Sequence, residues 1–135
     1  MQFTKAEEYG LFGAVHLAKQ PRGAVDSLTE ISQSQNIPDK FLAKIFQSMT
    51  RAGILKSHRG VRGGFSLVKP PKKISIADIL NAIQGDTDPV KCISNGETCS
   101  KRGDCAVRDL ILEGRKQMFA YYDKQTLEDL TVRTR

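Results

Sequence analysis

Three stretches near the start of the chain repeat apolar residues at helical spacing. Residues 3–19 carry apolar side chains on several sides, which favours a helix buried over most of its circumference. Residues 27–34 begin with a serine that is followed three residues later by Glu30, the pattern of a helix capping box. Residues 38–52 have one continuous apolar stripe, and Gly53 is suited to end this helix. The pattern therefore predicts three consecutive helices.

The third helix is the one whose two faces differ most. Its apolar stripe consists of Phe41, Leu42, Ile45, Phe46 and Met49. Its opposite side is polar and basic, and comprises Lys40, Lys44, Gln47 and Arg51. A helix that buries one face and presents hydrogen-bond donors on the other is suited to the major groove of DNA.

After residue 53 the pattern changes to short apolar runs. These runs flank a glycine-rich basic stretch, which predicts a β-hairpin over residues 54–68. A helix capped by Ser75 and Asp78 and stopped by Gly85 is expected next.

The remaining part of the chain combines a polar segment with a long helix. Residues 86–104 are expected to form a long loop of the functional kind. Residues 105–123 have an apolar stripe, interrupted by Gly114, that predicts a long helix. The tail has one short amphipathic turn and is expected to fray.

Three helices followed by a hairpin are typical of a winged helix-turn-helix. The sequence thus predicts a mainly α fold with a small β-hairpin wing and a long C-terminal dimerisation helix. Residues 1–73 would form the DNA-binding domain, residues 74–104 a linker helix and cysteine-containing loop, and residues 105–135 the dimerisation helix and tail. A homodimer is expected because two half-sites supply the affinity that one such module lacks.

Charge placement supports an interface with nucleic acid. The net charge is +6, but residues 1–73 carry +7 and residues 74–135 carry −1. Residues 40–73 contain nine Lys or Arg and no Asp or Glu. An acid-free basic window of this kind is the electrostatic footprint of a nucleic-acid surface, although a solubilising face is the simpler alternative.

The expected hairpin tip continues this basic surface. Gly60 and Gly63 would let it approach the phosphate backbone, and Arg59 and Arg62 could contact phosphates or enter a narrow minor groove. The predicted partner is a double-stranded DNA operator. No membrane partner is expected, because no apolar run approaches the roughly 18 residues of a membrane span.

Other functional classes find little support in the residues. No nucleophile or acid–base pair is visible, so neither an enzyme nor a small-molecule substrate is expected. The N-terminus has no apolar core like that of a signal peptide, which favours a cytoplasmic location with reduced thiols.

The remaining chemistry lies in three cysteines, Cys92, Cys99 and Cys105, which fall within 14 residues and are the only ones in the chain. Their spacing, C-x6-C-x5-C, lacks the close pairs of structural zinc sites. Inert surface thiols are one alternative, but the clustering counts against it. Soft thiolates on a loop suit an iron–sulfur cluster better, and such a cluster normally needs a fourth ligand.

Taken together, these segments resemble the bacterial winged-helix regulators that include the iron–sulfur cluster regulator IscR and the nitric-oxide-sensing repressor NsrR. The likeness covers almost the whole length and rests on MQFTKAEEYG, LTEISQSQNIP, FLAKIFQSMTRAGILKSHRGVRGGF, ISIADILNAIQG, TLEDL and the three cysteines. The wing pattern R-G-x-x-G-G-[FY] beside a cysteine triplet is its most specific part. The resemblance implies a homodimer with swapped contacts along the long helix, and a [4Fe-4S] or [2Fe-2S] cluster held by the cysteines.

The resemblance also bears on the fourth ligand. The histidine that completes the site in the IscR type is replaced here by Arg108, which cannot ligate. In NsrR-like members an acidic residue of the partner's first helix can serve, and Glu8 stands at the matching position with Glu7 beside it. A solvated carboxylate near a helix start is the alternative for Glu8. Ala43 replaces the glutamate that discriminates between operators in the IscR type, so operator preference does not carry over.

The sequence therefore predicts a DNA-binding transcriptional regulator, most simply a repressor. Its operator binding would respond to an iron–sulfur cluster that senses redox state, nitric oxide or iron–sulfur status. One alternative is a cluster-free regulator of the same fold that acts through thiol oxidation or a partner protein. Another is an iron–sulfur carrier or electron-transfer protein, which would leave the basic window unexplained.

Overall fold

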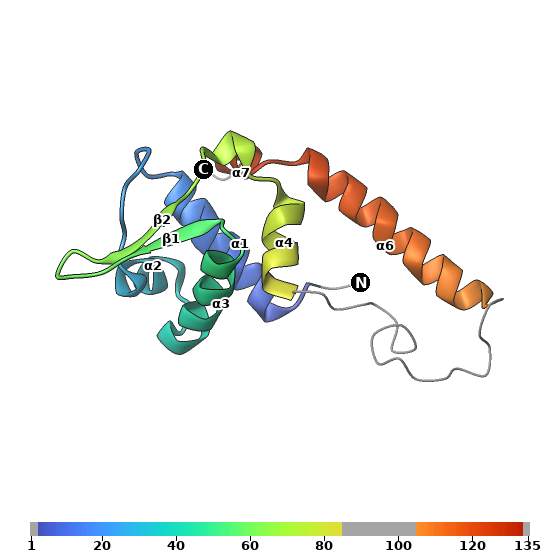
Figure 1. Ribbon diagram of the computed structural model, residues 1–135, viewed down its shortest axis with the longest axis horizontal. Coiled ribbons are helices and arrows are strands. Elements are labelled where there is room, and N and C mark those ends of the chain that lie inside the picture. Colours follow the sequence, from blue (N-terminus) through green and yellow to red (C-terminus); the bar gives the residue numbers. More distant parts are fainter. Residues whose placement is uncertain (1–2, 85–104, 134–135) are drawn as a thin grey trace.

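The structure is a computed structural model that describes residues 3–84 and 105–133 (Figure 1). In chain order its elements are α1 (Lys5–Ala18), α2 (Leu28–Gln35), α3 (Asp39–Arg51), β1 (Leu55–His58), β2 (Gly64–Leu67), the 3-10 helix η1 (Pro71–Lys73), α4 (Ile76–Gln84), α6 (Ala106–Lys124) and α7 (Leu127–Arg133). The predicted mainly α fold with a β-hairpin wing is confirmed.

Side-chain caps fix where several helices begin. Thr4 and Glu7 form a reciprocal capping box at the start of α1, a pattern that the sequence analysis overlooked. At α2, the Ser27 hydroxyl accepts from the backbone N–H of Glu30 at 3.1 Å, which is the serine half of the predicted box. Each such cap satisfies a backbone donor that the helix itself cannot pair.

The turn between α2 and α3 is held by local bonds. Asn36 ends α2 in the left-handed conformation, with φ 55°. The buried Ser32 hydroxyl lies 2.5 Å from the Ile37 carbonyl oxygen and also contacts the Asp39 carboxylate at the start of α3. Asparagine tolerates this backbone conformation better than most residues, so the chain reverses sharply between the two helices.

The core lies where α1, α3 and α4 meet. Its largest fully buried side chains are Phe46, Ile31, Leu42, Met49, Leu55, Ile79, Leu80 and Leu127. Two aromatic side chains assigned to helix cores from the sequence are instead half exposed, Phe12 at 54% and Phe41 at 50%. Phe41 packs at the surface, edge-on to Tyr9 with ring centroids 5.9 Å apart, because it sits at the margin of the α3 stripe.

The wing is a two-stranded antiparallel hairpin in which Leu55 pairs with Leu67 and His58 with Gly64. It extends away from the helices at one end of the molecule (Figure 1). A further bridge joins the hairpin to the chain before α2, where the backbone groups of Asp26 and Phe65 exchange bonds of 3.1 and 2.8 Å. Strand β2 is therefore paired on both of its edges.

The C-terminal elements have contrasting environments. Helix α6 contacts α4 and packs Phe119 and Tyr122 against the core, whereas its first turns extend away from the other helices (Figure 1). None of its residues is fully buried in this chain. Helix α7 returns to the core, where Leu127 is 0% exposed and its N–H donates to the Ile74 carbonyl oxygen at 2.9 Å. The predicted short amphipathic turn is therefore present as α7, which continues to Arg133 instead of fraying after one turn, because a tertiary contact stabilises it. None of the described helices is long and apolar enough to cross a membrane.

Candidate nucleic-acid interface and cysteine site

Helix α3 exposes all four polar side chains that the sequence assigns to DNA: Lys40, Lys44, Gln47 and Arg51. The hydroxyl of Ser48 lies between two of them, donating to the Lys44 carbonyl oxygen at 3.3 Å and accepting from the Arg51 guanidinium at 3.5 Å. Ser48 thus links the Arg51 head group to the helix surface. Lys40 and Lys44 border a depression of about 320 Å³ that also includes Ala6 and Ile83.

Helix α3 and the wing line one groove. A hollow of about 430 Å³ is lined by Gln47, Thr50 and Arg51 of α3 and by Ser57 and Phe65 of the hairpin. Two of the four predicted DNA-contacting side chains therefore lie on the same concave surface as the wing. This is the arrangement that a duplex contacted by both elements requires.

The wing tip presents the two predicted arginines to solvent, since Arg59 and Arg62 are both exposed. Gly60 has φ 107°, a conformation that favours glycine, and its carbonyl oxygen accepts from the N–H of Gly63 at 3.0 Å. A Cβ on Gly63 would lie only 2.5 Å from the His58 carbonyl oxygen. The glycines thus allow a compact tip that carries its cations outward.

Three residues that orient the wing were missed from the sequence. The ring nitrogen Nε2 of His16, on α1, lies 2.8 Å from the carboxylate of Asp26, whose backbone pairs with the hairpin. Arg22 donates to the carbonyl oxygens of Leu67 and Val68 at 3.2 and 3.3 Å. No periodicity or motif predicts these contacts, because they join positions that are far apart in the sequence.

The basic surface is available to an anionic partner. In the described parts of the chain, the ion pairs are Lys5–Glu8, His16–Asp26 and Arg108–Asp109. None of them involves a base of residues 40–73. The positive charge of α3 and the wing is therefore not neutralised by these pairs, which leaves it free to displace counterions from phosphates.

Of the three cysteines, only Cys105 lies within the described residues. It is half-buried and forms the N-cap of α6, where its sulfur accepts from the backbone N–H of Arg108 at 3.5 Å. Cys92 and Cys99 lie outside the described residues.

The two candidate carboxylates differ in how far they are engaged. The Glu7 side chain is buried at 4% exposure and accepts from the Thr4 N–H at 2.9 Å and from Gln84 Nε2 at 2.6 Å. The Glu8 side chain is 41% exposed and pairs with the Lys5 ammonium at 3.3 Å. Glu8 is thus the carboxylate that can turn to another ligand without breaking a buried hydrogen-bond network.

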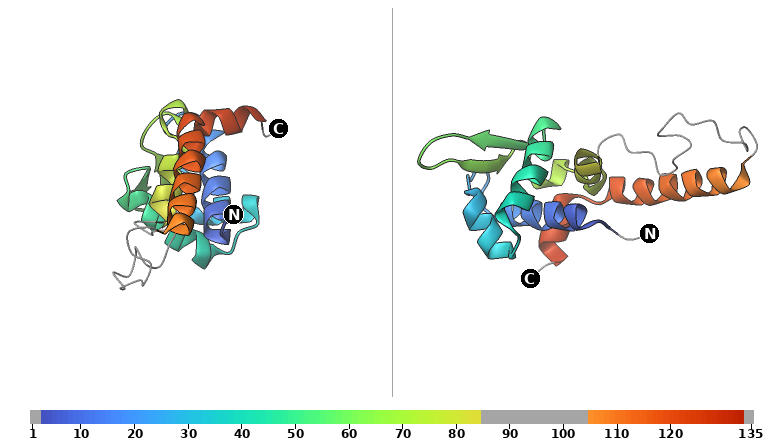
Figure 2. Two further views of the ribbon diagram at one scale, coloured as in Figure 1. Left: turned by 90° about the vertical axis from the view of Figure 1, so that its right-hand side faces the viewer. Right: turned by 90° about the horizontal axis from the view of Figure 1, so that it is seen from below.

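Glu8 and Cys105 belong to elements that do not meet within one chain. The start of α6 and the start of α1 lie well apart in Figure 1 and in the right-hand view of Figure 2. Accordingly, residues 3–84 and 105–133 hold no group of three or more His, Cys, Asp or Glu that could bind a metal ion. A site that used both residues would need a second copy of the chain.

Comparison with known proteins identifies the chain. Residues 3–133 match the sequence profile of the Rrf2 family, described as an iron-dependent transcriptional regulator. The chain belongs to the Rrf2 family. It is therefore a transcriptional regulator of a DNA-binding family, as the resemblance to IscR and NsrR implied.

The relatives with solved structures include CymR proteins from two bacteria. CymR of Bacillus subtilis, the global cysteine regulator, is 30% identical over 134 residues, covering 99% of this chain and 92% of the relative. Its structure has a TM-score of 0.79 and covers 100% of this chain and 99% of CymR. The oxidized form of Staphylococcus aureus CymR has a TM-score of 0.73 at 27% identity, covering 97% and 96% of the two chains.

IscR of T. potens has the same fold. Its TM-score is 0.78 at 23% identity, covering 100% of this chain and 89% of IscR. At this identity the likeness establishes the fold alone. The Rrf2 relatives thus share the winged-helix fold of this chain, but they do not determine which ligand its cysteines bind.

Proposed function

We propose that this Rrf2 protein is a repressor that binds a double-stranded DNA operator as a homodimer, and that an iron–sulfur cluster controls this binding. The observation that supports the DNA-binding part is the groove lined by both α3 and the wing, together with the exposed Lys and Arg side chains of these two elements. The proposal retains residues 1–73 as the DNA-binding domain, 74–104 as linker and cluster segment, and 105–135 as dimerisation helix and tail.

At the operator, α3 would read the major groove and the wing would contact the backbone. Gln47 and Arg51 line the groove and could reach base edges, whereas Arg59 and Arg62 at the tip could neutralise phosphates. Lys40 and Lys44 extend the same helix face. This division predicts that a tip arginine contributes affinity without sequence preference.

Salt dependence tests the role of the tip. Replacing Arg59 with Gln should weaken binding to specific and random duplexes alike, and should reduce the log–log salt slope by about one. Lys116→Gln, on exposed α6, removes the same charge and should leave the slope unchanged. An unaltered slope for Arg59→Gln would remove the wing from the proposed interface.

The homodimer would form through α6. Its exposed face carries Val107, Leu110, Gly114 and Tyr121, which recur at intervals of three, four and seven residues. Val107 and Leu110 are 64% and 73% exposed in this chain, a large apolar surface for a soluble helix. A second copy of α6 is the partner that such a repeat suits.

The cluster would be held by the thiolates of Cys92, Cys99 and Cys105, with Glu8 of the second copy as the fourth ligand. Soft thiolates suit iron–sulfur clusters, and the family profile is described as iron-dependent. When bound, the cluster would supply reactivity toward oxidants or nitric oxide. The position of Cys105 at the start of α6 would couple the site to the helix that sets the separation of the two recognition helices.

A second candidate is a cluster-free thiol sensor of the same fold. CymR, at 30% identity, is named a cysteine regulator, and an oxidized form of its staphylococcal relative has been solved. Here the cysteines would respond by oxidation rather than by holding iron. Both candidates keep the same DNA interface.

Purification without oxygen distinguishes the cluster-dependent regulator from the cluster-free thiol sensor. Purified without oxygen, a cluster protein should absorb visible light and contain iron and sulfide, and Cys105→Ser should lose both. A colourless protein without iron, whose operator affinity changes on mild peroxide treatment, would favour the thiol sensor instead. A coloured protein with no affinity for any operator would point to an iron–sulfur carrier, contrary to the proposal.

A further inference from the structure

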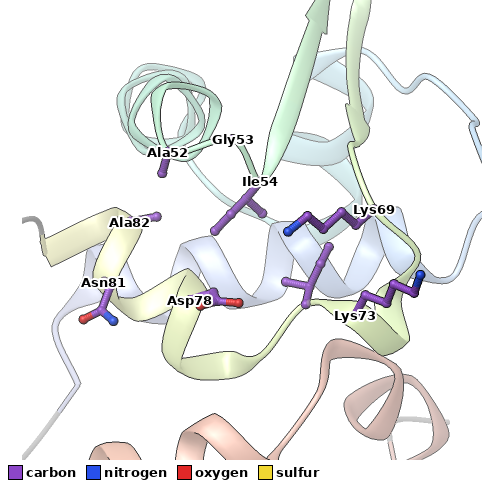
Figure 3. Close-up of a pocket in the computed structure, with 9 residues that line it drawn as sticks. Ala52, Gly53, Ile54, Lys69, Lys73, Asp78, Asn81 and Ala82 are labelled. Carbon is purple, nitrogen blue, oxygen red and sulfur yellow. The ribbon is translucent and has the colours of Figure 1, made fainter.

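A further pocket lies beside the C-terminal end of α3, where the chain leads into the wing (Figure 3). This pocket of about 340 Å³ is formed by residues that follow α3, by the segment after β2, by η1 and by α4. It shares no lining residue with the groove between α3 and the wing. Its lining includes Gly53, Ile54, Lys69, Ile74, Asp78 and Asn81.

The pocket combines an apolar floor with three charged lining residues, Lys69, Lys73 and Asp78. Ile54 and Ile74 are buried at 8% and 3% exposure. The side chain of Lys69 extends over the pocket, and the carboxylate of Asp78 lies on the α4 side (Figure 3). No ion pair joins these two residues in the described part of the chain, so each charge can meet a ligand.

The surroundings of Asp78 and Lys73 restrict which ligand charges the pocket can accept. One Asp78 oxygen accepts the capping bond from the Ser75 N–H at 3.4 Å, which leaves the other oxygen for a cation. Lys73 also lines the pocket, but its ammonium group points away from Lys69 and Asp78 (Figure 3). A purely anionic ligand such as phosphate would therefore gain one ammonium partner and face one carboxylate, which disfavours it.

We propose that this pocket binds a small zwitterion, an α-amino acid with a short apolar side chain. The carboxylate of the ligand would meet Lys69, its ammonium group would meet Asp78, and its side chain would cover Ile54 and Ile74. The volume falls at the lower end of the range for small-molecule sites, about 300–1,000 Å³, which suits a ligand of this size.

Such a ligand would contact two parts of the structure, the connection from α3 to the wing and helix α4. Gly53 and Ile54 connect α3 to the wing, whereas Asp78 and Asn81 belong to α4, the helix that precedes the cysteine segment. Bridging them would favour one relative position of the recognition helix and α4, and operator affinity would change accordingly. Binding itself does not depend on a cluster or on the operator, so it goes beyond the proposed function.

The test follows backbone amide signals of the full chain by two-dimensional ¹H–¹⁵N NMR, without DNA. L-alanine, L-valine and L-leucine are titrated separately, alongside propionate, ethylamine and inorganic phosphate. At least one amino acid should give saturable shifts at Gly53, Ile54 and Asn81, and propionate or ethylamine should bind at least about tenfold more weakly. Absence of shifts with all three amino acids, or equal binding of propionate or phosphate, would overturn the proposal.

Charge-removing variants identify the contacts. Lys69→Met and Asp78→Asn should each weaken binding by about tenfold, since each removes one charge-assisted hydrogen bond. The Asn side chain retains an oxygen for the Ser75 N–H, so α4 should keep its cap. Lys72→Met is the matched control, because Lys72 is exposed and does not line the pocket. Equal weakening by Lys72→Met would show only a non-specific charge effect and overturn the assignment.

Discussion

Gly64 is the residue at which the wing crosses the backbone that precedes α2. A Cβ at this position would overlap the carbonyl group of Asp26, which is backbone and cannot turn aside. Gly64→Ala should therefore break the Asp26–Phe65 bridge, lower the free energy of unfolding by about 1–3 kcal/mol and weaken operator binding. Urea unfolding and operator titration measure the two effects.

The matched control for Gly64 is Ser57→Ala, an exposed position in the same hairpin. Its free energy of unfolding should stay within about 0.5 kcal/mol of the wild-type value. If Gly64→Ala were equally mild, the contact with the chain before α2 would not determine the wing position.

Glu7 and Glu8 are neighbours in sequence with different physical roles. Glu7→Gln should cost about 1–3 kcal/mol of unfolding free energy, because the new amide group would face the Thr4 or Gln84 donor inside a buried site. Glu8→Gln removes a partly exposed pair with Lys5 and should cost less than about 1 kcal/mol. Thermal or urea unfolding of the cluster-free protein measures both.

The same two variants separate stability from ligation. With a cluster bound by Glu8, Glu8→Gln should alter the visible spectrum or hasten cluster loss while the fold persists. Glu7→Gln should leave the spectrum of the folded protein unchanged. The reverse pattern would transfer the ligand role to Glu7.

Among the elements, α7 shows how much a short helix depends on its tertiary contact. Leu127→Ala should cost about 2–5 kcal/mol, because this fully buried side chain belongs to the core. Val132→Ala, at a position 73% exposed in the same helix, should have almost no effect. Equal effects of the two substitutions in chemical unfolding would mean that α7 frays after all.

The start of α7 has its own pH dependence. The backbone N–H of Thr126 donates to the Asp129 carboxylate at 2.9 Å and, together with the Thr126 side chain, lowers the pKa of that carboxyl group. A depressed pKa means that this cap stabilises the fold at neutral pH and is lost as the carboxyl becomes protonated in acid.

The elements also show what the sequence could predict. Helices α1 to α4 and the hairpin were predicted nearly to the residue, because stripes, caps and glycines act locally. For α7 the sequence predicted only a short amphipathic turn that frays, since the stabilising partner Ile74 lies about fifty residues earlier. The same limit applies to the wing contacts of His16 and Arg22. The exposure of Lys40, Lys44, Gln47 and Arg51 could be predicted, because helical spacing places them opposite the apolar stripe of α3.

At the scale of the whole molecule, the proposed DNA surface and the proposed dimer interface lie at different ends. The groove of α3 and the wing lies toward one end, and α6 extends from the other end (Figure 1). The exposed apolar face of α6 is therefore far from the proposed DNA surface. Dimerisation along α6 could set the spacing of two recognition helices without occupying either of them.

Leu110 tests this separation, because it is 73% exposed in the isolated chain and central to the proposed interface. In the dimer, Leu110→Glu would bury a carboxylate against a second apolar helix, at a cost above the roughly 2 kcal/mol of the lost leucine burial. Light scattering coupled to size-exclusion chromatography should report a monomer whose helical circular dichroism is retained. Operator affinity should fall sharply, while weak binding to random DNA should persist because α3 and the wing are untouched.

Lys116→Glu provides the matched control, since it introduces the same acidic residue at an exposed position of α6 outside the Val107–Leu110–Gly114–Tyr121 face. It should remain dimeric and retain most of its operator affinity. A Leu110→Glu protein that is still dimeric and still binds its operator would show that α6 does not form the interface. Dimer loss in both variants would instead indicate a general intolerance of α6 to added negative charge, and the assignment of the interface to one face would fail.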